Sequence, residues 1–239
     1  MKKIFLSVLV VAAAFAAVAQ KEIVNDPNAE ERIISGSFNS IKISGGIDLF
    51  LSQSDNEAVA VSAAENKFKD AIKTEVINGR LKIYYDGDKG WNSIKNKKLK
   101  VYISFKNLDN LVASGACDVQ VSGSINVPSL ALKMSGASDF KGCIKVGDLK
   151  IELSGASDIK ICGIATTVSI ESSGASDVKG YDLVTDFCTA KASGASDINI
   201  TVNKELSVNA NGASDIYYKG EAVIKEMHSG GASSVSKKS

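Results

Sequence analysis

Ser154-Gly155-Ala156-Ser157-Asp158 is one copy of a five-residue motif that dominates the second half of the chain. Copies with at most one changed residue occupy 114–118, 135–139, 173–177, 193–197 and 211–215, and a more degenerate copy occupies 230–234. Their glycines recur at intervals of 18 to 21 residues, about 19 on average. Self-similarity at such a short period is typical of a solenoid in which each repeat forms one coil.

Apolar and polar residues alternate on both sides of each motif. Leu149, Ile151 and Leu153 stand six, four and two residues before Gly155, and Ile159 follows the motif directly. This alternation is typical of strands with one face turned inward, and the Ser-Gly-Ala corner turns the chain from one strand into the next. The pattern predicts an all-β fold, a parallel β-solenoid (right-handed β-helix-like) with ~19-residue coils.

Upstream of residue 111 the motif fades, apart from a divergent early copy at 44–48. Strand-like runs occupy 58–62, 72–77, 81–85 and 99–105, and Asn78-Gly79 is a hairpin signal. These features predict a β-rich front section over 33–110, packed against the first coil and covering its edge. Solenoid repeats are expected over 111–235, followed by a tail at 236–239.

The N-terminus has the parts of a secretory signal peptide. Lys2 and Lys3 precede an apolar run that ends in small residues before Gln20. This run is shorter than the ~20 residues that a membrane helix needs. We therefore expect residues 1–19 to be a signal peptide and residues 20–32 a flexible leader, which predicts an exported protein of the periplasm or outer cell surface.

Composition argues against several functional classes. The 28 Lys+Arg residues balance 27 Asp+Glu residues, so the chain lacks the basic character that binds nucleic acid. One His leaves little room for imidazole acid–base catalysis or for a multi-His metal site. Identical carboxylates made by repetition also offer no privileged acid–base pair of the kind that glycoside cleavage needs. We predict a protein that is not an enzyme.

Three sequence features follow one another in a specific order: the segment at 44–48, then Asn66 with the run at 74–83, then the serial Ser-Gly-Ala-Ser-Asp corners. In this order they resemble the auto-transporter adhesin, head-GIN-domain family of secreted Bacteroidetes-type proteins. The resemblance extends from Phe38 to Tyr218. It implies an all-β, solenoid-like domain in the cell envelope, and the family name implies adhesion.

The motif also repeats a Ser-Asp pair, which forms the candidate ligand face. The candidate residues are Asp139, Asp158, Asp177, Asp197, Asp215, Ser138, Ser157, Ser176, Ser196 and Ser214. Carboxylates about 5 Å apart repel one another by roughly 1 kcal/mol per pair even in water, so something must compensate them. Three interpretations remain: each Asp bonds backbone N–H groups at its own turn, the row binds Ca²⁺, or the row is a ligand-binding ridge.

The four cysteines divide into two groups. Cys143 and Cys162 each stand four residues after a motif Asp in consecutive coils, so a disulfide could join them, and two buried thiols are the alternative. Cys188 occupies a position that holds Leu or Val in other coils, and Cys117 replaces a motif Ser. No metal site or cofactor is predicted from them.

Three functions are compatible with this sequence. We favour an adhesin-like binding module of the cell envelope that presents the Ser/Asp face to a glycan or an envelope protein. The alternative is a structural protein that self-associates through its solenoid ends, which would make it a homo-oligomer. A polysaccharide-active enzyme is the third and least favoured.

Overall fold

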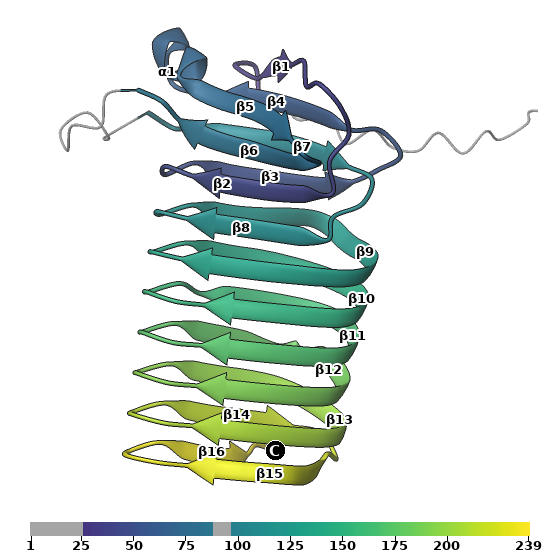
Figure 1. Cartoon of the computed structure of the whole chain (residues 1–239), viewed down its shortest axis with the longest axis vertical. Helices are drawn as coiled ribbons and strands as arrows, with labels where there is room; N and C mark the ends of the chain where they lie inside the picture. Colours follow the sequence, from purple (N-terminus) through teal and green to yellow (C-terminus); the bar gives the residue numbers. More distant parts are fainter. Residues whose placement is uncertain (1–25, 88–96) are drawn as a thin grey trace, which may run out of the picture.

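The protein is an elongated stack of β-coils in a computed structural model that describes residues 26–87 and 97–239 (Figure 1). The expected signal peptide at 1–19 lies outside the described residues. The parallel β-solenoid predicted from the repeats is confirmed, with about 7 turns of ~19 residues after a β-rich front section.

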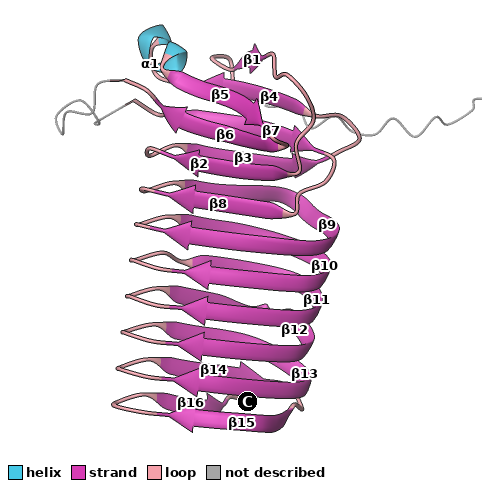
Figure 2. Ribbon diagram, viewed as in Figure 1, coloured by secondary structure: helices cyan, strands magenta, loops and turns pink. Residues whose placement is uncertain are grey.

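Strands account for nearly all of the regular structure (Figure 2). The described elements are β1 (Glu30–Arg32), β2 (Ser40–Ser44), β3 (Asp48–Gln53), β4 (Ala58–Ser62), α1 (Asn66–Asp70), β5 (Ile72–Ile77), β6 (Arg80–Tyr85), β7 (Lys100–Phe105), β8 (Asn110–Ser114), β9 (Asp118–Ser135), β10 (Asp139–Leu153), β11 (Ile159–Ser172), β12 (Asp177–Ala192), β13 (Asp197–Ala210), β14 (Asp215–Lys219), β15 (Val223–Ser229) and β16 (Ser234–Lys237). In the described ranges, no helix is long and apolar enough to span a membrane.

Each long strand from β9 to β13 bends once and so contributes to two opposed sheets (Figure 1). Its first half follows the Ser-Gly-Ala corner and pairs in the rear sheet, where β3 also lies beside β9. Its second half leads to the next corner and pairs in the front sheet, where β8 lies beside β9. Neighbouring coils are parallel. β10 and β11 pair in register throughout, so that Phe140 pairs with Ile159 and Leu153 with Ser172, whereas bulges shift the register between the other long strands.

The core lies between the two sheets. The predicted inward positions are buried: Leu149, Ile151 and Leu153 in one coil are each at most 3% exposed. Because a fully buried aliphatic side chain contributes about 1.5–3 kcal/mol through the hydrophobic effect, the stacked rows of these residues hold the coils together.

Glycine at the corner is required for two separate reasons. Gly155 has a φ of +81°, a conformation that L side chains rarely adopt. A Cβ atom added there would also lie 2.5 Å from the carbonyl oxygen of Gly136 in the preceding coil. The close approach allows a ladder of hydrogen bonds: from Ala156 to Ala232, each corner Ala donates its N–H to the carbonyl oxygen of the preceding corner Gly, as Ala156 does to Gly136 at 2.8 Å.

The front section covers the N-terminal end of the stack. The parallel stacking extends upstream of residue 111, since β2 pairs with β8 and β3 with β9 around the divergent 44–48 corner. Above them, β4 pairs antiparallel with β7, and β5 forms the predicted Asn78-Gly79 hairpin with β6. The short, charged β1 and the helix α1 complete this end (Figure 1).

Three local differences from the sequence prediction appear. Residues 30–32 were expected to belong to a flexible leader, but they form β1 and pair with β4. Helix α1 was not expected at all. In the predicted tail, Ser236 and Lys237 continue β16 and pair with β14. The local sequence pattern does not predict regular structure in these three segments. Their backbone groups are nevertheless hydrogen-bonded, by strand pairing in β1 and β16 and within a short helix in α1.

The C-terminal end differs from the N-terminal end. In the described structure, β15 pairs with β13 and β16 with β14, and each has its other edge open. Val223 and Met227 in β15 are 62% and 47% exposed. The last coil therefore presents backbone groups that inner coils pair, and Met227 is exposed although its pairing partner Val208 in β13 is buried.

Candidate functional site

The motif aspartates form a continuous row along the rear sheet, directly after the corners. We call Asp118, Asp139, Asp158, Asp177, Asp197 and Asp215 the Asp row. Strand pairing places Asp139 opposite Asp118 and Asp197 opposite both Asp177 and Asp215. All six are exposed or half-buried, so the row is accessible to solvent along the length of the solenoid.

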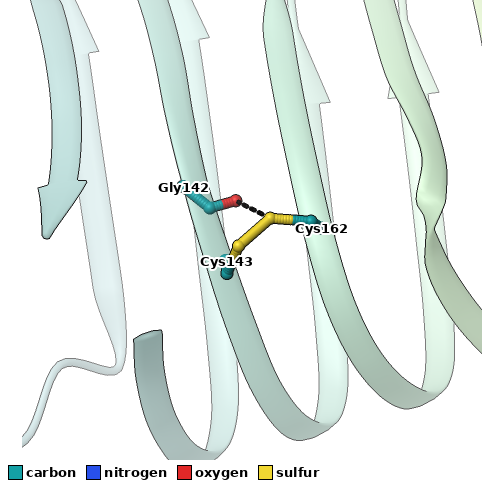
Figure 3. Close-up of a disulfide and its surroundings, with 3 residues drawn as sticks. All are labelled: Gly142, Cys143 and Cys162. Carbon is teal, nitrogen blue, oxygen red and sulfur yellow. Dashed lines mark hydrogen bonds between the residues drawn. A yellow bond between two sulfur atoms is a disulfide. The ribbon is translucent and has the colours of Figure 1, made fainter. Parts of the chain in front are cut away.

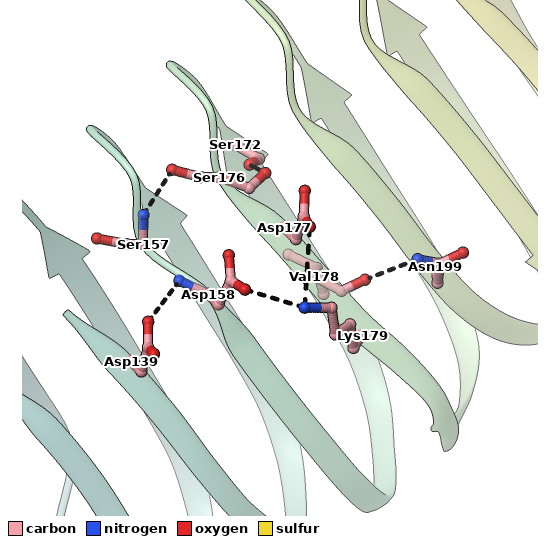
Figure 4. A network of polar contacts seen from close by, with 9 residues as sticks. All are labelled: Asp139, Ser157, Asp158, Ser172, Ser176, Asp177, Val178, Lys179 and Asn199. Carbon is pink, nitrogen blue, oxygen red and sulfur yellow. Dashed lines mark hydrogen bonds and ion pairs between the residues drawn. The ribbon is translucent and has the colours of Figure 1, made fainter. Parts of the chain in front are cut away.

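Hydrogen bonds between coils compensate part of this charge (Figure 4). The carboxylate of Asp139 accepts the backbone N–H of Asp158 in the next coil at 3.2 Å. Asp215 likewise accepts the N–H and the hydroxyl of Ser234, at 3.0 and 2.6 Å. One interpretation predicted that each Asp accepts backbone N–H groups of its own turn. Asp139 and Asp215 do accept backbone N–H groups, but these belong to the neighbouring coil.

A lysine neutralises the middle of the row. Lys179 Nζ lies 2.9 Å from Asp158 Oδ2 and 3.9 Å from Asp177 Oδ2 (Figure 4). The pKa of Lys179 is raised, chiefly by its hydrogen bond to Asp158. These contacts are exposed and individually weak.

Burial and neighbouring carboxylates raise the pKa values of two members of the row. Burial raises the pKa of Asp118, and Asp139 raises it further. Burial also raises the pKa of Asp197, to which Asp177 and Asp215 add repulsion. In contrast, hydrogen bonds from Ser234 and Tyr217 lower the pKa of Asp215. Asp118 and Asp197 therefore carry poorly compensated negative charge, whereas the carboxylate of Asp215 is stabilised by hydrogen-bond donors.

The motif serines do not belong to this surface. Ser138, Ser157, Ser176, Ser196 and Ser214, the Ser row, are each 0% exposed. Their hydroxyls close the corners: Ser196 donates to the carbonyl of Ser193 at 2.7 Å. Ser138, Ser157 and Ser176 also accept an N–H group from the preceding coil, as Ser176 does from Ser157 (Figure 4). The expected Ser/Asp ligand face is therefore corrected to an accessible Asp row beside a buried Ser row.

Metal ligands are not gathered in the described structure. Across residues 26–87 and 97–239, no group of three or more His, Cys, Asp or Glu side chains is placed to hold a metal ion. His228 is exposed on β15, in the last coil.

Two cysteines of neighbouring coils form a disulfide (Figure 3). Cys143 of β10 and Cys162 of β11 are paired in register, with 4.4 Å between their Cα atoms. Cys117 and Cys188 are free and buried, and burial raises the pKa of Cys188 to about 12. The thiol of Cys117 takes the role of a motif serine, with Sγ 3.3 Å from the carbonyl oxygen of Ser114.

A second accessible feature runs along the front sheet, on the other side of the corners from the Asp row. This front trough has a volume of about 450 Å³. It is lined by Lys133, Glu152, Leu153, Ser154, Glu171, Ser172, Ser173, Lys191, Ala192, Ser193, Asn209 and Asn211. Outward residues form its two walls. The first wall consists of residues three positions before a corner Gly, and the second wall of residues one position before it. From the sequence, the residues three positions before each corner Gly were recognised only as the polar half of the alternating pattern. The recurrence of Lys, Glu and Asn at that position is the signal that could have identified the trough.

Together these features define a repeat protein of the parallel β-solenoid class, with polar ladders exposed on both sheets. Its sequence matches the family model described as "Putative auto-transporter adhesin, head GIN domain" over residues 37–222, and the chain belongs to that family. The resemblance inferred from the 44–48 segment and the serial corners is thereby confirmed.

Solved structures share the fold. A putative adhesin from Bacteroides fragilis is 20% identical, with a TM-score of 0.80, over 88% of this chain and 96% of that one. A putative lipid-binding protein from Parabacteroides distasonis is 23% identical, with a TM-score of 0.66, over 90% of this chain and 98% of that one. A putative adhesin from the same species is 20% identical, with a TM-score of 0.69, over 88% of this chain and 96% of that one. No curated protein matches the chain.

Proposed function

We propose that this protein is an exported, non-enzymatic binding module of the cell envelope that uses the Asp row to hold a glycan or an envelope protein. The observation that supports this proposal most directly is the alignment of accessible carboxylates on consecutive coils, with Asp139 opposite Asp118 and Asp197 opposite Asp177. Membership of an adhesin-type family supports a binding role and an exported location.

Repetition favours binding over catalysis. Carboxylates on adjacent strands are about 4.8 Å apart, so the row offers equivalent acceptors at a regular spacing. A ligand with a repeated structure can make one weak contact per coil, and the contacts reinforce one another because the coils are rigidly linked. Catalysis needs instead one pair of groups with distinct pKa values and roles.

Export is supported by the disulfide as well as by the N-terminal sequence. Disulfides such as that between Cys143 and Cys162 persist in oxidising compartments, which include the periplasm and the cell surface.

Binding of the purified protein to a panel of glycans and matrix proteins tests the proposal, first with Ca²⁺ and then with a chelator. We expect saturable binding that is lost in the triple variant Asp158→Asn, Asp177→Asn, Asp197→Asn. The matched control removes three exposed carboxylates away from the row: Asp55→Asn, Asp148→Asn and Asp182→Asn. Equal binding by both triple variants, with the fold intact, would contradict a role for the row, and dependence on Ca²⁺ would add a metal to it.

Self-association is a second candidate, favoured by the open edges of β15 and β16 and by the exposure of Val223 and Met227. Unpaired strand edges can template pairing with another chain. Sedimentation velocity over a range of concentrations would then show assembly that the double variant Val223→Asp, Met227→Asp abolishes. Ile164→Asp, at an exposed apolar side chain in the middle of the stack, is the control.

A further inference from the structure

We propose that the front trough is a second binding site, distinct from the Asp row, and that it takes an extended, linear, uncharged glycan. This inference rests on the proposed function in assuming that the solenoid is a binding module. It names a different surface and a specific chemical class of ligand.

The charges of the trough are paired within its own walls. Lys133 Nζ lies 2.8 Å from Glu152 Oε2, and Lys191 Nζ lies 3.0 Å from Glu171 Oε1. Two lysines and two glutamates line the trough, so their formal charges cancel. A ligand that carried charge would have to break these pairs, whereas an uncharged ligand can bond to them as they stand.

The two glutamates occupy the centre of the trough, between the two lysines along the stack. Lys133 and Lys150 lower the pKa of Glu152 to about 2, so this side chain stays ionised at neutral pH. Because each glutamate is already paired with lysine, a polyanion finds no unpaired positive partner in the trough and would have to compete with these carboxylates. Acidic polysaccharides and nucleic acids are the wrong class of ligand.

The other wall consists of small polar groups. Ser173 donates its hydroxyl to the carbonyl of Leu153 at 3.1 Å, which fixes the hydroxyl oxygen so that it can accept a further hydrogen bond. At the last coil of the trough, Asn211 of this wall donates a hydrogen bond to the side-chain oxygen of Asn209 in the first wall. The apolar lining residues, Leu153 and Ala192, are only 3% and 2% exposed. Protein partners and lipids need exposed apolar anchors, and this surface does not provide them.

A hydroxyl-rich polymer fits what remains. Sugar hydroxyls both donate and accept hydrogen bonds, so they can match lysine donors, glutamate acceptors and serine or asparagine groups of both kinds. The lining repeats once per coil from β9 to β13, at a strand spacing of about 4.8 Å. This spacing is close to the monomer repeat of an extended β-linked glycan, so the polymer can lie along the solenoid axis with one sugar on each coil.

Because no aromatic side chain is among the described residues that line the trough, each sugar is held there by hydrogen bonds and binds weakly. Affinity must therefore accumulate with chain length. Calorimetry with cello-oligosaccharides of increasing length is the direct test. We expect no measurable binding of glucose, and affinity that rises with length and levels off once the chain spans the coils that line the trough.

Two substitutions locate the site. Ser173→Tyr places a large side chain in the trough, and Lys160→Tyr places the same side chain on an exposed position beside the Asp row. We expect Ser173→Tyr to weaken the longest oligosaccharide by about tenfold or more and Lys160→Tyr by less than about twofold. Length-independent binding, or equal effects of the two substitutions, would overturn the inference.

The two proposals can fail separately. Loss of cello-oligosaccharide binding in the Asp158, Asp177, Asp197 triple variant, but not in Ser173→Tyr, would assign the glycan to the Asp row and reject the trough. Absence of binding by the whole neutral series would also reject it, whatever the Asp row binds in the wider panel.

Discussion

The backbone N–H of Ser157 donates a hydrogen bond of 3.2 Å to the hydroxyl of Ser176 in the following coil. Ser138 makes the same bond to Ser157, and Cys117 makes it to Ser138. From Cys117 to Ser176 these hydrogen bonds form a buried ladder that ties four consecutive corners together, so the recurrence of serine there is explained by folding without any ligand.

Replacing a ladder serine should destabilise the protein. Ser176→Ala leaves the buried N–H of Ser157 without its acceptor, at a cost of about 1–3 kcal/mol in the free energy of unfolding. Ser176→Cys should retain much of the stability, because Cys117 already closes a corner with its thiol. Denaturant unfolding measures both, with the exposed Ser154→Ala as a control. A neutral Ser176→Ala variant would show that the ladder does not contribute to stability.

Charge removal within the Asp row should have opposite effects at different positions. A raised pKa means that the folded state binds protons more readily than the unfolded state. The destabilisation caused by the charges of Asp118 and Asp197 is therefore fully present above their folded pKa values, and it is relieved as the pH falls below 3.8, the ordinary pKa of an aspartate. We expect Asp118→Asn and Asp197→Asn to stabilise the protein at pH 7, with the gain fading in acid.

Asp215→Asn is the informative counterpart of these two variants. The pKa of the Asp215 carboxyl is lowered in the folded protein. The ionised carboxylate therefore stabilises the protein above pH 3.8, and this stability is lost as the pH falls through the folded pKa. This substitution should destabilise the protein at neutral pH and have little effect in strong acid. Thermal unfolding across this pH range measures the stability of the three variants. If all three substitutions change the stability in the same direction, the proposed difference between Asp118 and Asp197 on one hand and Asp215 on the other is wrong.

The disulfide should hold β10 and β11 together. It closes a chain segment with a sequence separation of 19, for which the loss of unfolded-state entropy corresponds to about 3 kcal/mol. Reduction, or the double variant Cys143→Ser, Cys162→Ser, should lower the denaturation midpoint accordingly. The double variant should then be insensitive to reductant. Thiol titration should find two free thiols in the denatured, non-reduced protein, and four would refute the bridge.

Corner glycines should be less replaceable than other glycines of similar backbone conformation. Gly155 and Gly123 have φ values of +81° and +74°. A Cβ at Gly123 would meet nothing within 4 Å, whereas at Gly155 it would collide with the preceding coil. Gly123→Ala should cost about 1 kcal/mol for its backbone conformation alone. Gly155→Ala should cost clearly more, and equal unfolding free energies for the two variants would count against the role of close stacking.

Regular repetition made most of the fold predictable. A period-2 pattern identifies inward residues such as Ile151, and the hairpin at Asn78-Gly79 follows from local turn chemistry. The burial of Ser157 could not be read in this way, because the left-handed conformation of Gly155 rotates the chain within the corner and interrupts the alternation. The front trough was missed because its two wall rows, Glu152 and Ser154 for example, are ordinary polar positions until neighbouring coils align them.

The Asp row shows the same division between what sequence and structure reveal. Its regular spacing was evident from the motif, but its compensation was not, since the bond from Asp158 N–H to Asp139 joins residues of different coils. Lys179, which neutralises the middle of the row, could be placed near it from its position two residues after Asp177. That Lys179 lies closer to Asp158 than to Asp177 depends on how neighbouring coils are placed relative to each other, which the sequence pattern does not specify.

The in-register pairing of Cα partners, such as Lys150 with Ser169 and Ile151 with Ile170, has a consequence for how this protein can change in evolution. A coil contacts its two neighbours and little else, so duplication or deletion of one whole unit alters the reach of the molecule and leaves the packing of every other unit as it was. Genes for such proteins can therefore vary in length in steps of one coil, and each step adds or removes one rung from both exposed ladders at once.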